Sequence, residues 1–328
     1  MGGVWSGLGE SVFVADISAG ERSAWRLLGG LVGGLGIAIV AALAAWALTM
    51  TGFTLWAGLG AQGLQGLGEA AQRFVDPAQK GLGVAVARLL VATVVDGGFL
   101  LAFAAFAAAA ARQPLHVYIT AAARTRGRLL LVGMALASLA LAPAVVAERV
   151  LTGGGTLPIL AASPDLTGRI LYGACALLLI PAAAAEELVF RGWLLRRTAV
   201  FVTQPGLLIV FTGVLFAAAH FDFNPDAFLT RTLMGGGFAY MTLRLGGIEF
   251  SSGAHAAHNM LIVLFLEPIN LQPDHPTIST FSLLEDISLL VGYFIITEAV
   301  VHIPVLRGWA RVQAREISPP DNQAAATP

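Results

Sequence analysis

Long apolar runs dominate the chain, and short polar stretches separate them. A helix that spans a membrane needs about 20 mainly apolar residues. Runs of roughly this length predict eight spans, at residues 27–50, 81–111, 129–147, 169–196, 206–221, 227–244, 250–267 and 286–305. We therefore expect an all-α, polytopic membrane protein with about eight transmembrane helices.

The composition agrees with this fold class and excludes several functions. Of the 328 residues, 57% are hydrophobic and 12% are charged, whereas about 25% are charged in an average soluble domain. The formal net charge is −1, so the chain has no basic field that could hold nucleic acid phosphates. The composition excludes a soluble enzyme, a disordered protein and a nucleic-acid binder, and it predicts the lipid bilayer as the surroundings.

The segments outside the spans have distinct characters. Residues 4–25 are mixed and predict an amphipathic segment on the membrane surface. Residues 113–127 predict a polar connection with an interfacial helix, and residues 316–328 predict a disordered tail. The first twenty residues contain Glu10 and Asp16 but no Lys or Arg, so we expect the first span to be retained as an anchor.

The basic residues predict the orientation in the membrane. With eight spans and a cytoplasmic N-terminus, thirteen of the nineteen basic residues fall on the inner side. This bias favours two cytoplasmic termini. Almost all the basic residues are arginines, and alanine and glycine are abundant, which is typical of a GC-rich bacterial genome. We expect an integral protein of the bacterial inner (cytoplasmic) membrane.

Two adjacent carboxylates follow an apolar run in the fourth predicted span. Ionisable groups inside lipid cost about 2.5–3.5 kcal/mol each on insertion scales, so they are functional candidates. Glu187 lies four residues before Arg191, and the two can pair on one helix face. Glu186 lies about 100° around the helix and has no such local partner. A carboxylate in an apolar site suits a general base, and the alternative is a salt bridge at the helix end.

Three more polar residues occur in the next predicted spans. His220 ends an apolar run, where a lone histidine is more often structural than chemical. His255 and Asn259 are four residues apart, so both side chains can point into one cavity. His258 points elsewhere on that helix, to the membrane interface.

The spacing around residues 203–206 predicts that Glu186 and His220 meet. Glu186 is eighteen residues before the expected turn and His220 is sixteen after it, so an antiparallel hairpin puts them at similar depth. We expect Arg196 and Arg197 near the lipid headgroups, with Glu186 about 15 Å deeper. Asp222 follows His220 closely and belongs near water, which requires either a water-filled cavity or a short, tilted helix.

These residues resemble the three-motif signature of the CPBP family. The motifs are Glu186-Glu187-x-x-x-Arg191, Phe216-x-x-x-His220 and His255-x-x-x-Asn259, in order on consecutive apolar segments. That family contains the type II CAAX prenyl endopeptidases and the bacteriocin-processing ABI proteins. The resemblance covers about residues 168–268. It divides the chain into N-terminal helices of unassigned role (1–167), a CPBP-like catalytic core (168–306) and a basic, then disordered cytoplasmic tail (307–328).

The resemblance implies an intramembrane endopeptidase that cleaves a membrane-associated protein or peptide. Glu186 and His220 would activate a water, and His255 and Asn259 would stabilise the oxyanion. Glu187 and Arg191 would brace the site or hold the substrate. Members of the family have been described both as glutamate proteases and as metalloproteases. We favour activation without a cofactor. If zinc takes part, Glu186, His220 and His255 could supply the three ligands.

Other functions remain as alternatives. The substrate could be a bacteriocin leader, a membrane-anchored regulator or the C-terminal sorting tail of an exported protein. A non-catalytic immunity or scaffold protein would not need all four polar groups. A small-solute transporter would predict inverted repeats, and none is evident. The sequence also lacks the His-Glu-x-x-His and Gly-x-Ser-x-Gly motifs of other protease classes.

The remaining polar groups in the spans have structural interpretations. We expect Asp96 and Arg88 to pair with neighbouring helices. Glu298 and His302 are four residues apart and predict a structural pair. Cys175, the only cysteine, is expected to be a small core residue.

Overall fold

The regular elements of the described chain are helices. The computed structural model describes residues 11–76, 78–151, 155–267, 269 and 280–311. Within these ranges the one β-type contact is an isolated bridge between Thr120 and Gly247. The all-α fold class is confirmed. The predicted tail at 316–328 lies outside the described residues, while residues 304–310 form a helix.

The first half of the described chain alternates long and short helices. They are α2 (Val12–Ala15), α3 (Ala19–Arg22), α4 (Ala24–Trp56), η1 (Gly60–Gln62), α5 (Leu64–Val75), α6 (Leu82–Leu90), η2 (Val91–Val95), α7 (Asp96–Ala110), η3 (Leu115–Tyr118) and α8 (Gly127–Leu151). The π-helical turn η2 joins α6 and α7 into one helix of 29 residues.

The second half contains the helices that carry the motifs. They are α9 (Pro158–Ala161), α10 (Leu166–Ala176), α11 (Leu179–Glu187), η4 (Leu188–Leu194), α12 (Leu195–Ala199), α13 (Pro205–Ala218), α14 (Pro225–Leu245), α15 (Glu249–Leu261), η5 (Ile262–Leu266), α16 (Thr280–His302) and α17 (Pro304–Ala310). The segments from α10 to α12 form one helical rod, Leu166–Ala199, which we call the motif helix.

All eight predicted apolar segments are helical, but fewer of them can cross a bilayer. Four helices are long and apolar enough: Ala24–Trp56, Leu82–Ala110, Gly127–Leu151 and Leu166–Ala199. A fifth is gained if Ser282–His302 and Pro304–Ala310, bent by 92°, count as one span. The described part of this polytopic membrane protein therefore provides four to five candidate spans, and not the eight expected.

The physical reasons for the smaller count differ among the remaining helices. Helix α13 has 14 residues, which is about 21 Å of helix against a hydrocarbon core of about 30 Å. Helix α14 carries charges along its length, including Asp226, Arg231 and Arg244. Helix α15 starts at Glu249, and its first nine residues are buried. The second half of α14 and the first nine residues of α15 are buried inside the protein, whereas α13 leaves Leu207, Val210 and Phe211 exposed.

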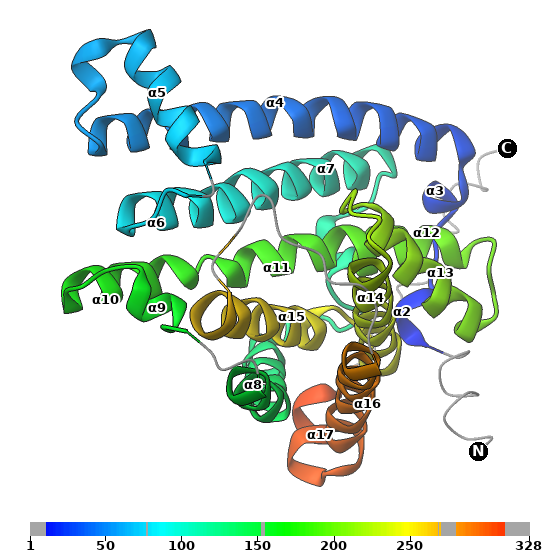
Figure 1. The fold of residues 1–328 in the computed structure, drawn as a ribbon. Helices are drawn as coiled ribbons and strands as arrows, with labels where there is room; N and C mark the ends of the chain where they lie inside the picture. Colours follow the sequence, from blue (N-terminus) through cyan, green and yellow to red (C-terminus); the bar gives the residue numbers. More distant parts are fainter. Residues whose placement is uncertain (1–10, 77, 152–154, 268, 270–279, 312–328) are drawn as a thin grey trace, which may run out of the picture.

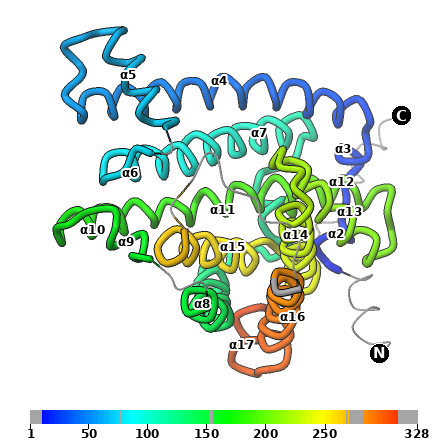
Figure 2. Tube along the Cα trace, viewed as in Figure 1, coloured from blue at the N-terminus to red at the C-terminus, as the bar shows by residue number. Residues whose placement is uncertain are grey.

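The helices stack in layers around the motif helix. In Figure 1, α4 lies above α6 and α7, followed by α10 and α11, then α15 and finally α8. Figure 2 shows α14 and α16 close to end-on, so they cross this stack steeply. Helix α14 packs against α13, α15 and α16. The motif helix thus lies in the middle of the protein, with about half of its most apolar part buried.

A glycine allows the close approach of α15 to α8 in this stack. A Cβ on Gly253 of α15 would lie 2.0 Å from the carbonyl oxygen of Leu130 in α8. Because real Cβ atoms do not approach an oxygen so closely, only glycine allows this helix crossing. The contact presses α15, the helix that carries His255 and Asn259, against α8.

The predicted polar connection at 113–127 clamps the start of α15. It contains only a short 3-10 turn, η3, in place of the expected interfacial helix. Its backbone pairs with the α14–α15 junction through Ala121 N to Gly246 O, 3.0 Å, and Ile248 N to Ile119 O, 2.9 Å. Arg126 also holds Glu249 through a contact of 2.7 Å between Nη2 and Oε2.

Candidate functional site

The motif helix presents its two adjacent carboxylates to different surroundings. Glu187 ends α11 and is completely buried, whereas 22% of the Glu186 side chain is exposed. Neighbouring residues of a helix point about 100° apart, which explains the difference. The π-helical turn η4 follows Glu187 directly, and such turns are frequent at functional sites. One carboxylate is therefore open to water while the other is enclosed by protein.

Glu187 and Arg191 form the predicted ion pair, and both side chains are fully buried. Nη1 of Arg191 lies 3.0 Å from Oε1 of Glu187. Nη2 of Arg191 donates to the carbonyl oxygen of Gly235 in α14, at 3.0 Å. The guanidinium also lies over the Phe216 ring, 4.2 Å from its centroid. Arg191 therefore ties the motif helix to both α13 and α14.

His255 lies between the two carboxylates. Its Nδ1 atom is 3.1 Å from Oε1 of Glu187, and its Nε2 atom is 3.9 Å from Oε2 of Glu186. The ring is 2% exposed and is stacked on Phe238, with 4.8 Å between centroids and 28° between planes. A hydrogen on Nδ1 points to Glu187, because a carboxylate oxygen accepts. Nε2 is then directed to the Glu186 side of the site.

His220 lies two residues after the end of the short helix α13 and is exposed. Its Nδ1 atom is 2.8 Å from the carbonyl oxygen of Phe216. Because a carbonyl can only accept, Nδ1 carries the hydrogen and Nε2 of the neutral ring keeps its lone pair. Phe216 connects the two histidines, with its ring centroid 4.7 Å from that of His220 and 6.0 Å from that of His255. Glu186 also interacts electrostatically with His220.

The start of α13 agrees with the predicted turn around residues 203–206. Gln204 caps α13 by accepting a hydrogen bond from the backbone of Leu207, and Pro205 occupies the first helical position. His220 lies at the open end of the short α13, which accommodates Asp222 near water. Asp222 pairs with Arg231 at 2.7 Å between Oδ2 and Nη1.

The third motif places Asn259 one turn after His255 on α15, where it is half-buried. His258 is half-buried rather than interfacial, because its Nδ1 atom lies 3.3 Å from the hydroxyl of Tyr293 in α16. The side chains named by the three motifs thus come from one group of helices, the motif helix, α13 and α15. Glu186, Glu187, Arg191 and His255 are joined by contacts of 3.9 Å or less.

The structure corrects the expectation that Arg196 and Arg197 lie near headgroups. Arg196 is 1% exposed and makes a two-point contact with Glu21, with Nε to Oε1 at 2.8 Å and Nη2 to Oε2 at 3.0 Å. Arg197 is 3% exposed and donates to the backbone carbonyl of Glu21. Residues 11–22, which we call the N-terminal strap, therefore pack on the end of the motif helix. The described part of the predicted amphipathic segment at 4–25 holds the short helices α2 and α3 and the start of α4.

Glu21 is held ionised within the strap. Burial opposes its ionisation, but the hydrogen bonds and positive charge of Arg196 outweigh burial and keep the pKa of Glu21 below its ordinary value. A capping box with Ser18 fixes the carboxylate further. The strap thus supplies the counter-charge that a buried guanidinium needs.

The other polar residues in the spans have mostly structural partners. Arg88 donates to the backbone carbonyls of Phe74, in the neighbouring helix α5, and of Asp76, in agreement with the expected pairing with a neighbouring helix. Glu298 pairs with His302 at 3.1 Å between Oε2 and Nε2, and also accepts from Arg244. Asp96 is exposed. Cys175 is half-buried among apolar side chains.

The arrangement of the candidate carboxylates and histidines decides whether they could bind a metal ion. Within the described residues, no group of three or more His, Cys, Asp or Glu side chains is arranged so that it could hold one. Glu186, His220 and His255, the ligands expected if zinc takes part, therefore do not form a three-donor site as they stand. We derive no chemical step through a metal.

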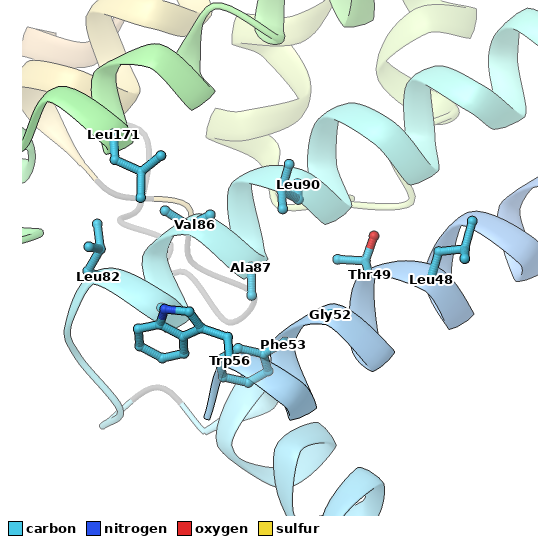
Figure 3. Close-up of a pocket in the computed structure, with 11 residues that line it drawn as sticks. Leu48, Thr49, Gly52, Phe53, Trp56, Leu82, Val86, Ala87, Leu90 and Leu171 are labelled. Carbon is cyan, nitrogen blue, oxygen red and sulfur yellow. The ribbon is translucent and has the colours of Figure 1, made fainter. Parts of the chain in front are cut away.

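Two cavities are lined by residues other than these side chains. One, of about 280 Å³, opens between the end of α4 and α6 (Figure 3) and is lined by Phe53, Trp56 and Leu90 among others. The second, of about 540 Å³, is bordered by α7, the motif helix and the start of α15, including Ala185 and Ser252. Neither cavity is lined by a polar residue of the three motifs.

Three residues at the site were not singled out from the sequence. Gly235 accepts from Arg191, Phe238 stacks on His255, and Tyr293 contacts His258. The glycine run 235–237 was an available signal, because glycine inside a helix often marks a close approach. Phe238 and Tyr293 have no such signal, since aromatic residues are common in apolar helices.

Comparisons with known proteins agree with the motif assignment. Residues 168–261 match the family described as type II CAAX prenyl endopeptidase Rce1-like. A Bacillus subtilis (strain 168) protein named Uncharacterized protein YyaK is 38% identical over 105 residues, which is 30% of this chain and 35% of that protein. The chain thus spans about a third of the length of this curated relative. No solved structure matches the chain. The comparisons thus identify a type II CAAX prenyl endopeptidase Rce1-like domain at residues 168–261 of this chain.

Proposed function

We propose that this protein is an intramembrane endopeptidase that hydrolyses a peptide bond in a membrane-associated protein or peptide. The observation that carries the proposal is the position of His255 between two carboxylates, one buried and one open. The match of residues 168–261 to the endopeptidase family supports the same activity. The catalytic core would extend over residues 168–306.

In the proposed reaction, Glu186 is the general base. Its carboxylate is partly exposed, so a water molecule can reach it. Glu186 takes a proton from this water while Nε2 of His220 accepts the second hydrogen bond and orients it. The water oxygen then attacks the carbonyl carbon of the peptide bond. Protonated Glu186 returns the proton to the leaving amine, which balances the hydrolysis.

His255 and Asn259 are proposed to stabilise the oxyanion. Because Nδ1 of His255 donates to Glu187, Nε2 can donate to an oxyanion only when the ring is protonated. Because Glu186 has by then taken the water proton, Glu187 and the oxyanion itself would balance the charge of that form. The Asn259 amide would supply the second donor. Glu187 and Arg191 would hold His255 in place and would not touch the substrate.

The surroundings of the enzyme are part of the proposal. We propose that it resides in a bacterial inner membrane with both termini in the cytoplasm. The substrate is proposed to be a C-terminal tail or another membrane-associated segment, including the sorting tail of an exported protein. Neither zinc nor another cofactor is assigned a step.

A comparison of membrane proteomes tests this function and identifies the substrate at the same time. Cells with the wild-type chain are compared with cells that carry Glu186→Gln, a variant of nearly equal size. We expect at least one membrane-associated protein to gain mass in the variant, by the length of the uncleaved segment. Identical proteomes at equal abundance of the two chains would instead favour a non-catalytic immunity or scaffold protein.

A further inference from the structure

Tyr293 lies behind the candidate oxyanion site, outside the segment that matches the family. It belongs to α16, is 1% exposed, and its hydroxyl lies 3.3 Å from Nδ1 of His258. Its ring centroid is 5.1 Å from that of Phe238, which is itself stacked on His255. Tyr293 is thus linked to α15 in two ways. The polar route is the contact of its hydroxyl with His258, and the aromatic route is the packing of its ring on Phe238.

The backbone of α14 is shaped to admit this tyrosine. A Cβ on Gly237 would lie 2.8 Å from Cδ2 of Tyr293, so a larger residue at position 237 would displace the ring. On the other side of α14, Arg191 donates to Gly235. The glycine run therefore packs α14 between the Glu187–Arg191 pair and Tyr293.

The polar route ends next to the candidate oxyanion donors. His258 precedes Asn259 in the chain and follows His255 by three residues, so it lies on the same turn of α15. A hydrogen bond from α16 to His258 restrains the rotation of α15 about its axis. The aromatic route restrains the tilt of the His255 ring, because Phe238 is held between that ring and Tyr293.

We propose that Tyr293 is a positioning residue that sets the orientation of His255 and Asn259 from α16. This inference rests on the proposed function for its kinetic consequence. In this role Tyr293 does not touch the substrate and acts through His258 and Phe238, besides its electrostatic interaction with Glu187 and Arg191. It would make α16, which lies beyond residues 168–261, a necessary part of the active site.

The test compares two tyrosine-to-phenylalanine variants of the full chain. Tyr293→Phe removes the hydroxyl that contacts His258 and keeps the ring. Tyr240→Phe is the matched control, because the Tyr240 hydroxyl donates to Glu298, away from the motif residues. With the substrate found by the proteome comparison, we expect Tyr293→Phe to lower kcat about fivefold at unchanged KM, as expected for the loss of one hydrogen bond. Tyr240→Phe should keep the wild-type kcat.

A second measurement does not depend on activity. The chain has six histidines, so side-chain 15N resonances of labelled protein in detergent can be assigned with histidine variants. We expect Tyr293→Phe to shift the resonances of both His258 and His255, and Tyr240→Phe to leave these two unchanged. An unshifted His255 resonance in Tyr293→Phe would overturn the proposal, as would an unchanged kcat in an enzyme that Glu186→Gln inactivates. If no cleavage occurs at all, the proposed function fails and the resonances alone decide the role of Tyr293.

Discussion

One oxygen of Glu187 lies 3.1 Å from Nδ1 of His255 and 3.0 Å from Nη1 of Arg191. This shared oxygen connects the first and third motifs, which are 68 residues apart in the sequence. All three side chains are buried. Because water does not reach these side chains, a charged group among them depends on its neighbours for stabilisation.

Glu187→Gln should destabilise the protein strongly. The substitution leaves the guanidinium of Arg191 buried without a counter-charge, and breaking a buried pair costs about 3–5 kcal/mol. Glu69→Gln is the matched control, since Glu69 and Arg73 form an i,i+4 pair whose side chains are 41% and 43% exposed. Such an exposed pair contributes about 0.3–0.5 kcal/mol. Thermal unfolding in detergent measures the loss of stability in both variants. Equal unfolding midpoints for the two variants would contradict this explanation of the buried pair.

Gly235→Ala should impair the site although it adds one methyl group. The new Cβ would lie 3.0 Å from Cα of Gly213 and 3.1 Å from Nη2 of Arg191, so α13 or Arg191 must shift. Gly236→Ala is the control, because the nearest atom to its Cβ is Cγ2 of Ile209 at 3.4 Å. We expect cleavage to fall at least tenfold in the first variant and to stay within about twofold in the second. A reversed order of the two activities would refute the packing argument.

Removal of Glu21 should loosen the end of the motif helix in a pH-dependent way. The pKa of Glu21 is lowered in the folded protein, so its stabilisation is fully present above the unfolded value of about 4.3 and is lost as the pH falls through the folded value. Glu21→Gln should therefore unfold at a lower temperature than wild type at pH 7. The two midpoints should converge as the pH falls below about 4, and a difference that persists unchanged there would exclude this origin.

Treatment with a chelator distinguishes a glutamate protease from a metalloprotease. Because the proposed hydrolysis contains no metal-dependent step, we expect cleavage by purified, metal-stripped protein to survive strong chelation. The measurement is the cleavage rate before and after chelation, with zinc added back as a control. Loss of activity on chelation and its return with zinc would show that Glu186, His220 and His255 rearrange around an ion.

The sequence predicted the long helices well, for physical reasons, and the three motifs lie within the segment 168–261 that matches the endopeptidase family. Twenty-residue apolar runs have few alternatives to a spanning helix, and spacings of four residues place side chains on one face. The number of spans was overestimated because apolar content alone does not distinguish a helix in lipid from one enclosed by protein. Helix α13, with its 14 residues, and the enclosed α15 illustrate this.

The arginines show where sequence reasoning failed. Arg196 and Arg197 follow an apolar run, and this pattern is typical of residues at a membrane surface. Their partner Glu21 is 175 residues from Arg196, so no local spacing could reveal the contact. The same holds for Tyr293, whose role depends on which helices pack together. Tertiary contacts between distant segments, not helix propensity, account for what the sequence did not predict.

The most direct test of the central claim is the cleavage rate of Glu186→Gln, measured on the substrate that accumulates in its presence. Glutamine has nearly the same size and keeps a polar carbonyl, but it cannot take a proton from water. We expect the variant to be as abundant and as stable as wild type and to cleave at least a hundredfold more slowly, since removal of a general base typically costs about 10²–10⁴ in rate. A folded Glu186→Gln variant with the wild-type rate would contradict the proposed mechanism.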